Sequence, residues 1–163
     1  MRVSASIEVA ASPQVVWDQV SDPTHYLDFM SGITRWEVCS DDPRGLGARY
    51  RMSMRVGSAE IGGLVEVIEW VEGRDMAWTS VTGLDQRGRW RLRERPGGRT
   101  HVELRLSYGV AGAGFWGWIS ERVGAPTVRG HLQHTVRHLK RQVEQEQTRR
   151  RAAARRQAGV GAS

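Results

Sequence analysis

One strand-like segment sets the first constraint on this chain. Residues 49–56, RYRMSMRV, alternate without a break, so that Tyr50, Met52 and Met54 fall on one side of an extended chain and the arginines fall on the other. Successive side chains of a strand point to opposite faces, so the segment predicts a strand with one buried and one wet face. Methionine is an adaptable filler that is also common on surfaces that receive varied ligands. The pattern leaves open whether this face meets a solid core or a cavity.

The other segments predict two short helices near the N-terminus and strands through the middle of the chain. RVSASIEVA at the N-terminus alternates like a strand. Ser12 and Pro13 then predict the start of a short helix, because serine caps helices and proline suits the first helical position. Asp22 and Pro23 repeat this pattern for a second short helix. Six further strands are expected in the segments ITRWEVC, ARYRMSMRV, AEIGGLVEVIEWV, DMAWTSV, GRWRLRER and THVELRLSY.

The register of one hairpin can be predicted from its faces. Trp90 and Leu92 should share the buried side with Leu104, which requires a loop of odd length. A three-residue loop over 97–99 satisfies this requirement and predicts that Leu92 pairs with Leu104.

The only long helix is expected at the end of the chain. Its apolar residues recur at steps of four, four, three and four, which places them on one helix face: Val128, Leu132, Val136, Leu139 and Val143. A curved sheet with one apolar face needs a cover, and this helix alone is long enough. One helix does not fill the concave side of a seven-stranded sheet, so we expect an apolar hollow beside Met52 and Met54. A concave side without a void able to admit a benzene ring would contradict this expectation.

Composition and charge limit the class of protein. The 163 residues suit one domain, and the whole net charge of +6 lies from Arg137 onward, where eight basic and two acidic residues occur. Cys39 is alone, which excludes an internal disulfide, and the N-terminus lacks the apolar core of a signal peptide. The longest uncharged run, Leu106 to Ser120, has 15 residues, fewer than the about 20 that span a bilayer. We therefore expect a cytoplasmic protein.

The sequence resembles the START-like superfamily and, within it, the polyketide cyclase/dehydrase-like branch. The segments that carry the resemblance are IEVAASPQVVWDQVSDPTHYLDFMSGITRWEV, GLGARYRMSMRVG, VEVIEWVEGRDMAW and HLQHTVRHLKRQVE. The resemblance implies an α+β helix-grip fold, in which a seven-stranded curved antiparallel sheet surrounds a long C-terminal helix and two short helices follow the first strand. It also implies a cavity for a lipid, an isoprenoid or a polyketide-like aromatic. We expect one START-like domain over residues 1–147 and a disordered Arg/Ala-rich tail over 148–163.

The predicted function is to bind or carry a hydrophobic small molecule, without a cofactor. The predicted cavity wall consists of Tyr50, Met52, Met54, Trp78, Trp90, Leu104, Leu106, Tyr108, Leu132 and Val136. Strand parity leaves the face of Trp78 open, because DMAWTSV has apolar residues on both sides. The alternative function is a cyclase or aromatase that acts on a carrier-bound polyketide, with Tyr50 or Tyr108 as proton donor. The same tyrosines have a second interpretation as core residues, and their role stays open here.

The histidines of the last helix and the outward arginines could indicate a metal site or a nucleic-acid partner. His131, His134 and His138 fall away from the apolar helix face, which favours a solvated surface over a metal site. The outward arginines have no interleaved aromatic residues on their face, and Glu60, Glu66 and Glu103 can neutralise them, so no nucleic-acid partner is expected.

The segment 115–119, FWGWI, is interpreted either as a lid with transient membrane contact or as a buried anchor. The sequence leaves both monomer and homodimer open.

Overall fold

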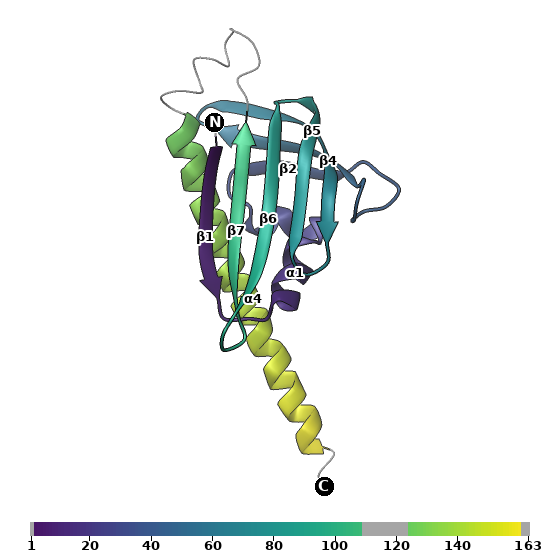
Figure 1. The fold of residues 1–163 in the computed structure, drawn as a ribbon, viewed down its shortest axis with the longest axis vertical. Helices are drawn as coiled ribbons and strands as arrows, with labels where there is room; N and C mark the ends of the chain where they lie inside the picture. The colour runs from purple at the N-terminus through teal and green to yellow at the C-terminus, as the bar shows by residue number, and fades with distance from the viewer. Residues whose placement is uncertain (1, 109–123, 161–163) are drawn as a thin grey trace.

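The computed structural model describes residues 2–108 and 124–160, which form a curved antiparallel sheet and a long C-terminal helix (Figure 1). Seven strands form the sheet in the order β1-β7-β6-β5-β4-β3-β2. Their bounds are β1 Arg2–Val9, β2 Ile33–Val38, β3 Arg49–Val56, β4 Ala59–Val71, β5 Asp75–Gly83, β6 Gln86–Arg95 and β7 Arg99–Tyr108. This arrangement confirms the α+β helix-grip fold.

Three short helical elements connect β1 to β2: α1 (Pro13–Val20), the 3-10 helix η1 (Pro23–His25) and α2 (Tyr26–Phe29). Asp22 caps η1 as predicted, because its carboxylate accepts the backbone N–H of Thr24 at 2.9 Å. Ser12 occupies the N-cap position of α1, but its side chain makes no capping hydrogen bond. The local start signal of α1 is therefore the proline at its first position, whose φ suits a helix and whose missing N–H costs no hydrogen bond there.

The long helix α4 (Gly124–Val160) packs against the inside of the curved sheet (Figure 1). All five members of the predicted apolar stripe, from Val128 to Val143, are buried. Two polar contacts fasten the helix to the end of β1: Lys140 Nζ donates to the carbonyl of Glu8 at 2.9 Å, and Glu144 accepts the N–H of Ala10 at 2.9 Å. No helix within residues 2–108 and 124–160 is long and apolar enough to cross a bilayer.

Residues 148–160, predicted from the sequence to belong to a disordered tail, continue α4 as helix. Alanine, arginine and glutamine have high helix propensity, and Arg150 pairs with Glu146 one turn earlier at 2.9 Å. Arg150 also reaches Asp18 of α1 at 3.1 Å. None of residues 148–159 is buried, so helix propensity and exposed ion pairs hold this part of the helix, whereas tertiary packing holds the part before Gln147.

The β6–β7 hairpin has the expected odd loop length and matched faces, but a different register. Its three-residue loop covers 96–98, and Leu92 pairs with Val102 instead of Leu104. Proline has no N–H for a strand ladder and a fixed φ, so Pro96 begins the turn and β6 ends one residue before it. The two glycines that follow both have a positive φ, which a turn of this length requires.

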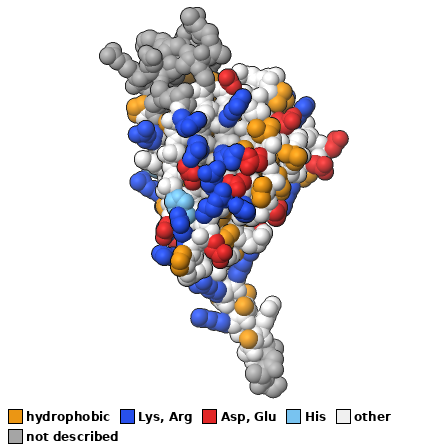
Figure 2. All heavy atoms as spheres, viewed as in Figure 1, with side chains coloured by type: hydrophobic (Ala, Val, Ile, Leu, Met, Phe, Trp, Pro, Cys, Tyr) orange, Lys and Arg blue, Asp and Glu red, His pale blue; other side chains and the backbone are white. Residues whose placement is uncertain are grey.

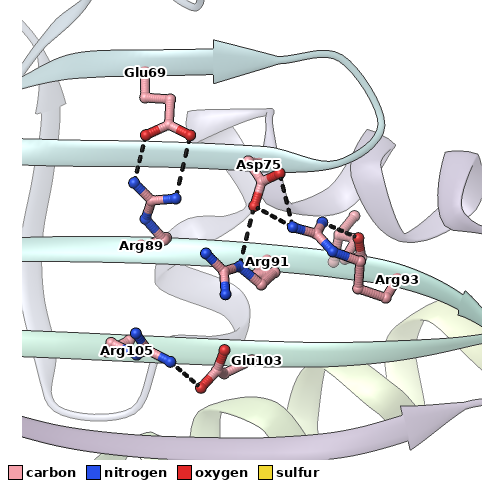
Figure 3. A network of polar contacts seen from close by, with 8 residues as sticks. Glu69, Asp75, Arg89, Arg91, Arg93, Glu103 and Arg105 are labelled. Carbon is pink, nitrogen blue, oxygen red and sulfur yellow. Dashed lines mark hydrogen bonds and ion pairs between the residues drawn. The ribbon is translucent and has the colours of Figure 1, made fainter.

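The outer, convex face of the sheet carries interleaved basic and acidic side chains (Figure 2). Asp75 accepts from Arg91 Nε at 3.4 Å and from Arg93 at 3.1 Å, while Arg89 pairs with Glu69 (Figure 3). The predicted neutralisation is present at Glu66, which pairs with Arg49 of the neighbouring strand at 2.6 Å. Glu103 pairs instead with Arg105 of its own strand at 2.8 Å. Glu60 instead accepts from the hydroxyl of Thr34 at 3.0 Å.

A close approach of Trp78 to Gly88 connects β5 to β6 on the concave face. The two residues are register partners, and a Cβ added at Gly88 would lie 1.9 Å from Cζ2 of the Trp78 indole. Carbon atoms do not approach this closely without bonding, so only glycine leaves room for the indole in this position.

Substitution of Gly88 by alanine is therefore expected to push the Trp78 indole out of its position. We expect a loss of about 1–3 kcal/mol in the free energy of unfolding, the usual cost of overpacking a core. Urea unfolding monitored by tryptophan fluorescence measures this loss. The matched control is Gly130→Ala, since Gly130 lies in α4 with open space at its Cβ position, and this change should stabilise the protein by about 0.5–1 kcal/mol. Equal effects of the two substitutions would show that the Trp78 contact is not the cause.

Candidate functional site

A small apolar cavity lies between the sheet and the first half of α4. Its walls come from the segment after α2, from strands β2, β3, β5, β6 and β7, and from α4. The lining residues are Met30, Ser31, Ile33, Trp36, Met52, Met54, Trp78, Gln86, Leu104, Leu106, Leu132 and Thr135. The cavity volume is about 20 Å³, which is close to the space that one water molecule needs. The ligand-sized hollow expected from the sequence is therefore not enclosed by the described residues.

Three methionines form the adaptable part of the cavity wall. Met52 and Met54 project from the concave face of β3, as the alternation of that strand predicts, and Met30 follows α2. Met52 lies opposite Trp36 of β2, and its sulfur accepts a hydrogen bond from the Gln86 amide at 3.0 Å. A methionine side chain has three rotatable bonds and no branch, so it can change shape without a shift of the backbone.

The segment after α2 is fastened to α4 beside the cavity. The backbone N–H of Ser31 donates to the hydroxyl of Thr135 at 2.9 Å, and Oγ of Ser31 lies 3.1 Å from Nδ1 of His131. Gly32 has a φ of 84°, and a Cβ there would lie 2.8 Å from the His131 ring. The prediction of a solvated His131 therefore holds only in part, because its helix position, which faces away from the apolar stripe, also meets this segment and leaves the side chain half-buried. His134 is exposed, as expected.

An aromatic cluster fills the other end of the concave face, beside α2. Trp36 stacks on Tyr50 at 5.2 Å and contacts Tyr26 at 4.5 Å between ring centroids. Phe29 joins Tyr26 to Trp90, with ring centroids 5.5 and 6.2 Å apart. The hydroxyl of Tyr50 donates to the carbonyl of Pro43 at 2.8 Å, in the connection between β2 and β3. These rings form a packed core, and of this group only Trp36 also lines the cavity.

The structure places six of the ten predicted wall residues around the cavity: Met52, Met54, Trp78, Leu104, Leu106 and Leu132. The side chain of Trp78, whose face the sequence left open, therefore lies on the concave side of the sheet. Tyr50 and Trp90 belong to the aromatic cluster, and Tyr108 is half-buried at the end of β7, opposite Gln86. Val136 lines a separate groove of about 290 Å³ between β1 and α4. The segment 115–119, interpreted from the sequence as a lid or as a buried anchor, lies outside the described residues.

Strand parity alone did not identify Ile33 and Trp36 as cavity neighbours. The two residues are three apart, which places them on opposite faces of a regular strand. The pairing of β2 with β3 shifts between Ile33 and Arg35, however, and this irregularity brings both side chains to the concave face. No signal in the sequence marks this shift.

Comparison with known proteins assigns the chain to a family. The model of the family described as "Polyketide cyclase / dehydrase and lipid transport" matches residues 1–144. The chain belongs to this family. The match covers the sheet, the short helices and the packed part of α4, and it confirms the resemblance on which the cyclase/dehydrase-like prediction was based.

Solved structures share the fold of this polyketide cyclase/dehydrase family member at low sequence identity. A protein from Thermus thermophilus is 20% identical with a TM-score of 0.75, and the match covers 88% of this chain and 97% of that one. A START superfamily protein from Mycobacterium smegmatis is 20% identical with a TM-score of 0.63, covering 91% and 97%. The Zhui aromatase/cyclase from a Streptomyces species is 21% identical with a TM-score of 0.64, covering 94% and 97%. No curated protein matches the sequence significantly.

The tyrosines of this family member stay protonated well beyond neutral pH. Burial raises the pKa of Tyr50 to about 12, and it raises the pKa of Tyr26 well above its ordinary value. Burial also raises the pKa of Tyr108. The hydroxyls of Tyr50 and Tyr26 are both engaged, since Tyr26 donates to the carbonyl of Val20. At neutral pH these two side chains therefore act as neutral donors that join chain segments.

The raised pKa of Tyr50 predicts a loss of stability at high pH. Between about pH 10 and pH 12 the unfolded chain loses a proton that folded Tyr50 retains, so the free energy of unfolding falls as pH rises, by at most about 1.4 kcal/mol per pH unit for one group. Tyr50→Phe should cost about 1 kcal/mol near pH 8, where the bond to Pro43 is lost. It should also make the decline above pH 10 shallower.

Urea unfolding of both proteins across this pH range measures the two slopes. Tyr26 remains in both proteins, and burial is the main cause of its raised pKa. Tyr50 adds to that rise, so its removal should make the contribution of Tyr26 to the decline smaller as well. Parallel slopes above pH 10 would contradict the assignment to Tyr50.

Proposed function

We propose that this protein binds a hydrophobic small molecule in the cavity between the concave face of the sheet and α4. The observation that carries the proposal is the position of three methionines around an internal apolar cavity that is lined by both the sheet and α4. The family description includes lipid transport, and one structural neighbour is an aromatase/cyclase. Both point to lipids, isoprenoids or polyketide-like aromatics as the ligand class.

Binding requires the cavity to widen. Cavities that hold benzene measure about 150 Å³, far more than the about 20 Å³ present between the described residues. Rotation of Met30, Met52 and Met54 provides the softest route, because their side chains can move while the strands stay in place. Leu104 and Leu106 project from the adjacent strand β7 and offer an apolar surface to a ligand that takes up the new space.

The polar part of the cavity wall favours binding over acid–base catalysis. Its polar side chains are those of Ser31, Gln86 and Thr135, apart from the indole N–H groups. None of the three titrates near neutral pH, whereas a cyclase needs a proton donor and acceptor beside the substrate carbonyl. Tyr50 lies in the aromatic cluster, where its hydroxyl is engaged by Pro43.

A ligand that fits this cavity should raise the thermal stability of the protein. Oleic acid, farnesol and naphthol serve as probes of the three ligand classes, and a probe at one hundred times its Kd should add about 2.7 kcal/mol to the free energy of unfolding. Differential scanning calorimetry measures the shift in Tm, and native mass spectrometry of the purified protein detects a ligand that is already bound.

Met54→Phe tests the location of binding, because the larger and stiffer ring occupies the space into which the ligand must move. We expect whichever probe stabilises the wild-type protein to bind at least tenfold more weakly. Tenfold in Kd corresponds to a loss of roughly 1.4 kcal/mol, which the lost apolar contact should account for. The matched control is Ile68→Phe, on an exposed position of β4, which should leave binding unchanged. The proposal is wrong if none of the three probes stabilises the wild-type protein and no ligand co-purifies.

A further inference from the structure

We infer that the ligand carries a hydrogen-bond acceptor, a carbonyl oxygen on an otherwise apolar skeleton, and that the indole N–H groups of Trp36 and Trp78 bind this oxygen. The inference rests on the proposed function and adds the chemical class of the ligand. The supporting observation is that the cavity wall has more hydrogen-bond donors than acceptors that can pair with them.

Two buried donors on this wall have no partner. Trp36 and Trp78 both line the cavity, with only 9% and 4% of their surfaces exposed. The Nε1 atoms of both indoles are fully buried and have no hydrogen-bond partner among the described residues. Buried polar groups are almost always paired in folded proteins, so an unpaired group in a wall calls for an explanation.

The third donor of the wall is paired only weakly. The Gln86 amide nitrogen donates to the Met52 sulfur at 3.0 Å, and a thioether is a poor acceptor. The backbone N–H of Gln86 donates to Ser80 Oγ at 3.2 Å, which holds this residue in place. The remaining polar side chains of the wall are also engaged, because the Thr135 hydroxyl accepts from the backbone N–H of Ser31 and the Ser31 hydroxyl lies 3.1 Å from Nδ1 of His131. An acceptor supplied by the ligand would therefore find donors without competition from the protein.

Both indoles are held in place by packing on separate strands. Trp36 of β2 stacks on Tyr50 with an interplanar angle of 30°, and Trp78 of β5 lies directly over Gly88. Strands β3 and β4 separate them in the sheet, so the two indoles reach the cavity wall from strands that are not neighbours. Donors that are already ordered lose little freedom when they bind a ligand.

The size of the cavity suits an oxygen atom before any rearrangement. The about 20 Å³ beside these side chains is close to the space of one water molecule, and therefore also of one carbonyl oxygen. The carbonyl group can occupy this space while the apolar skeleton displaces the methionine side chains. A hydrocarbon of the same shape would leave both indole N–H groups unpaired and should bind more weakly.

Two probes of nearly equal shape test this inference. Acetophenone carries a carbonyl oxygen where α-methylstyrene carries a methylene group. Titration of each into the full-length, ¹⁵N-labelled protein is followed by the indole N–H resonances of the seven tryptophans. With acetophenone we expect the Trp36 and Trp78 resonances to move downfield, and the Trp17 resonance, from a buried and equally unpaired indole outside the cavity, to stay in place. With α-methylstyrene none of the three should move downfield.

The affinities provide the second readout. After correction for the different water-to-alkane transfer of the two probes, acetophenone should bind about tenfold more tightly, as expected for one or two net hydrogen bonds. Trp78→Phe and Trp36→Phe should each reduce this preference, and Trp70→Phe, whose indole donates to Glu72 at 3.0 Å, should not. Each variant needs an unchanged Tm in the absence of probe, and two cavity variants guard against a folding failure in one of them.

The outcomes separate this inference from the proposed function. Equal corrected affinities for both probes, or binding of acetophenone without a shift at Trp36 or Trp78, would overturn the acceptor inference and leave the proposed function standing. Failure of both probes to bind, together with failure of oleic acid, farnesol and naphthol, would overturn both.

Discussion

The apolar stripe of α4, from Val128 to Val143, packs inside the curve of the sheet, and the rest of the structure depends on this contact. Each of these side chains contributes about 1.5–3 kcal/mol when it is removed from water. All five are buried, as are residues of the sheet such as Leu92, Val102 and Leu104. The sheet cannot bury its concave face without the helix, and the helix has no second apolar face to offer. The two elements therefore determine each other's position.

The concave face is divided into a rigid part and an adaptable part. At one end the rings of Tyr26, Phe29, Trp36, Tyr50 and Trp90 pack together, and the two tyrosine hydroxyls donate to backbone carbonyls that precede their own elements in the chain. At the other end methionines and leucines surround a water-sized space. Trp36 belongs to both parts, so it links the aromatic cluster to the cavity wall. This division allows one half of the interior to stabilise the fold while the other half changes shape for a ligand.

Much of this architecture could be predicted from residue patterns. The alternation of residues 49–56 correctly predicted the buried face of β3, and the spacing from Val128 to Val143 correctly predicted the buried stripe of α4. The wall residues that were missed depend on contacts without a local signal. The shift in β2 that turns Ile33 and Trp36 to the same face is one case, and the packing of His131 against Gly32 is another. Register in the β6–β7 hairpin was set by Pro96, whose effect on strand length outweighed the glycines beside it.

The central claim is that the methionine-lined wall opens to admit a hydrophobic molecule, and methyl resonances test it most directly. With ¹³C-methyl-labelled methionine, a titration with farnesol reports separately on Met30, Met52 and Met54 in the cavity wall and on Met76, which is buried outside it. Our account predicts saturable shifts of the three wall methyl groups with one shared Kd, and little change at Met76. Saturable binding of farnesol that leaves all three wall methyl groups unshifted would contradict it.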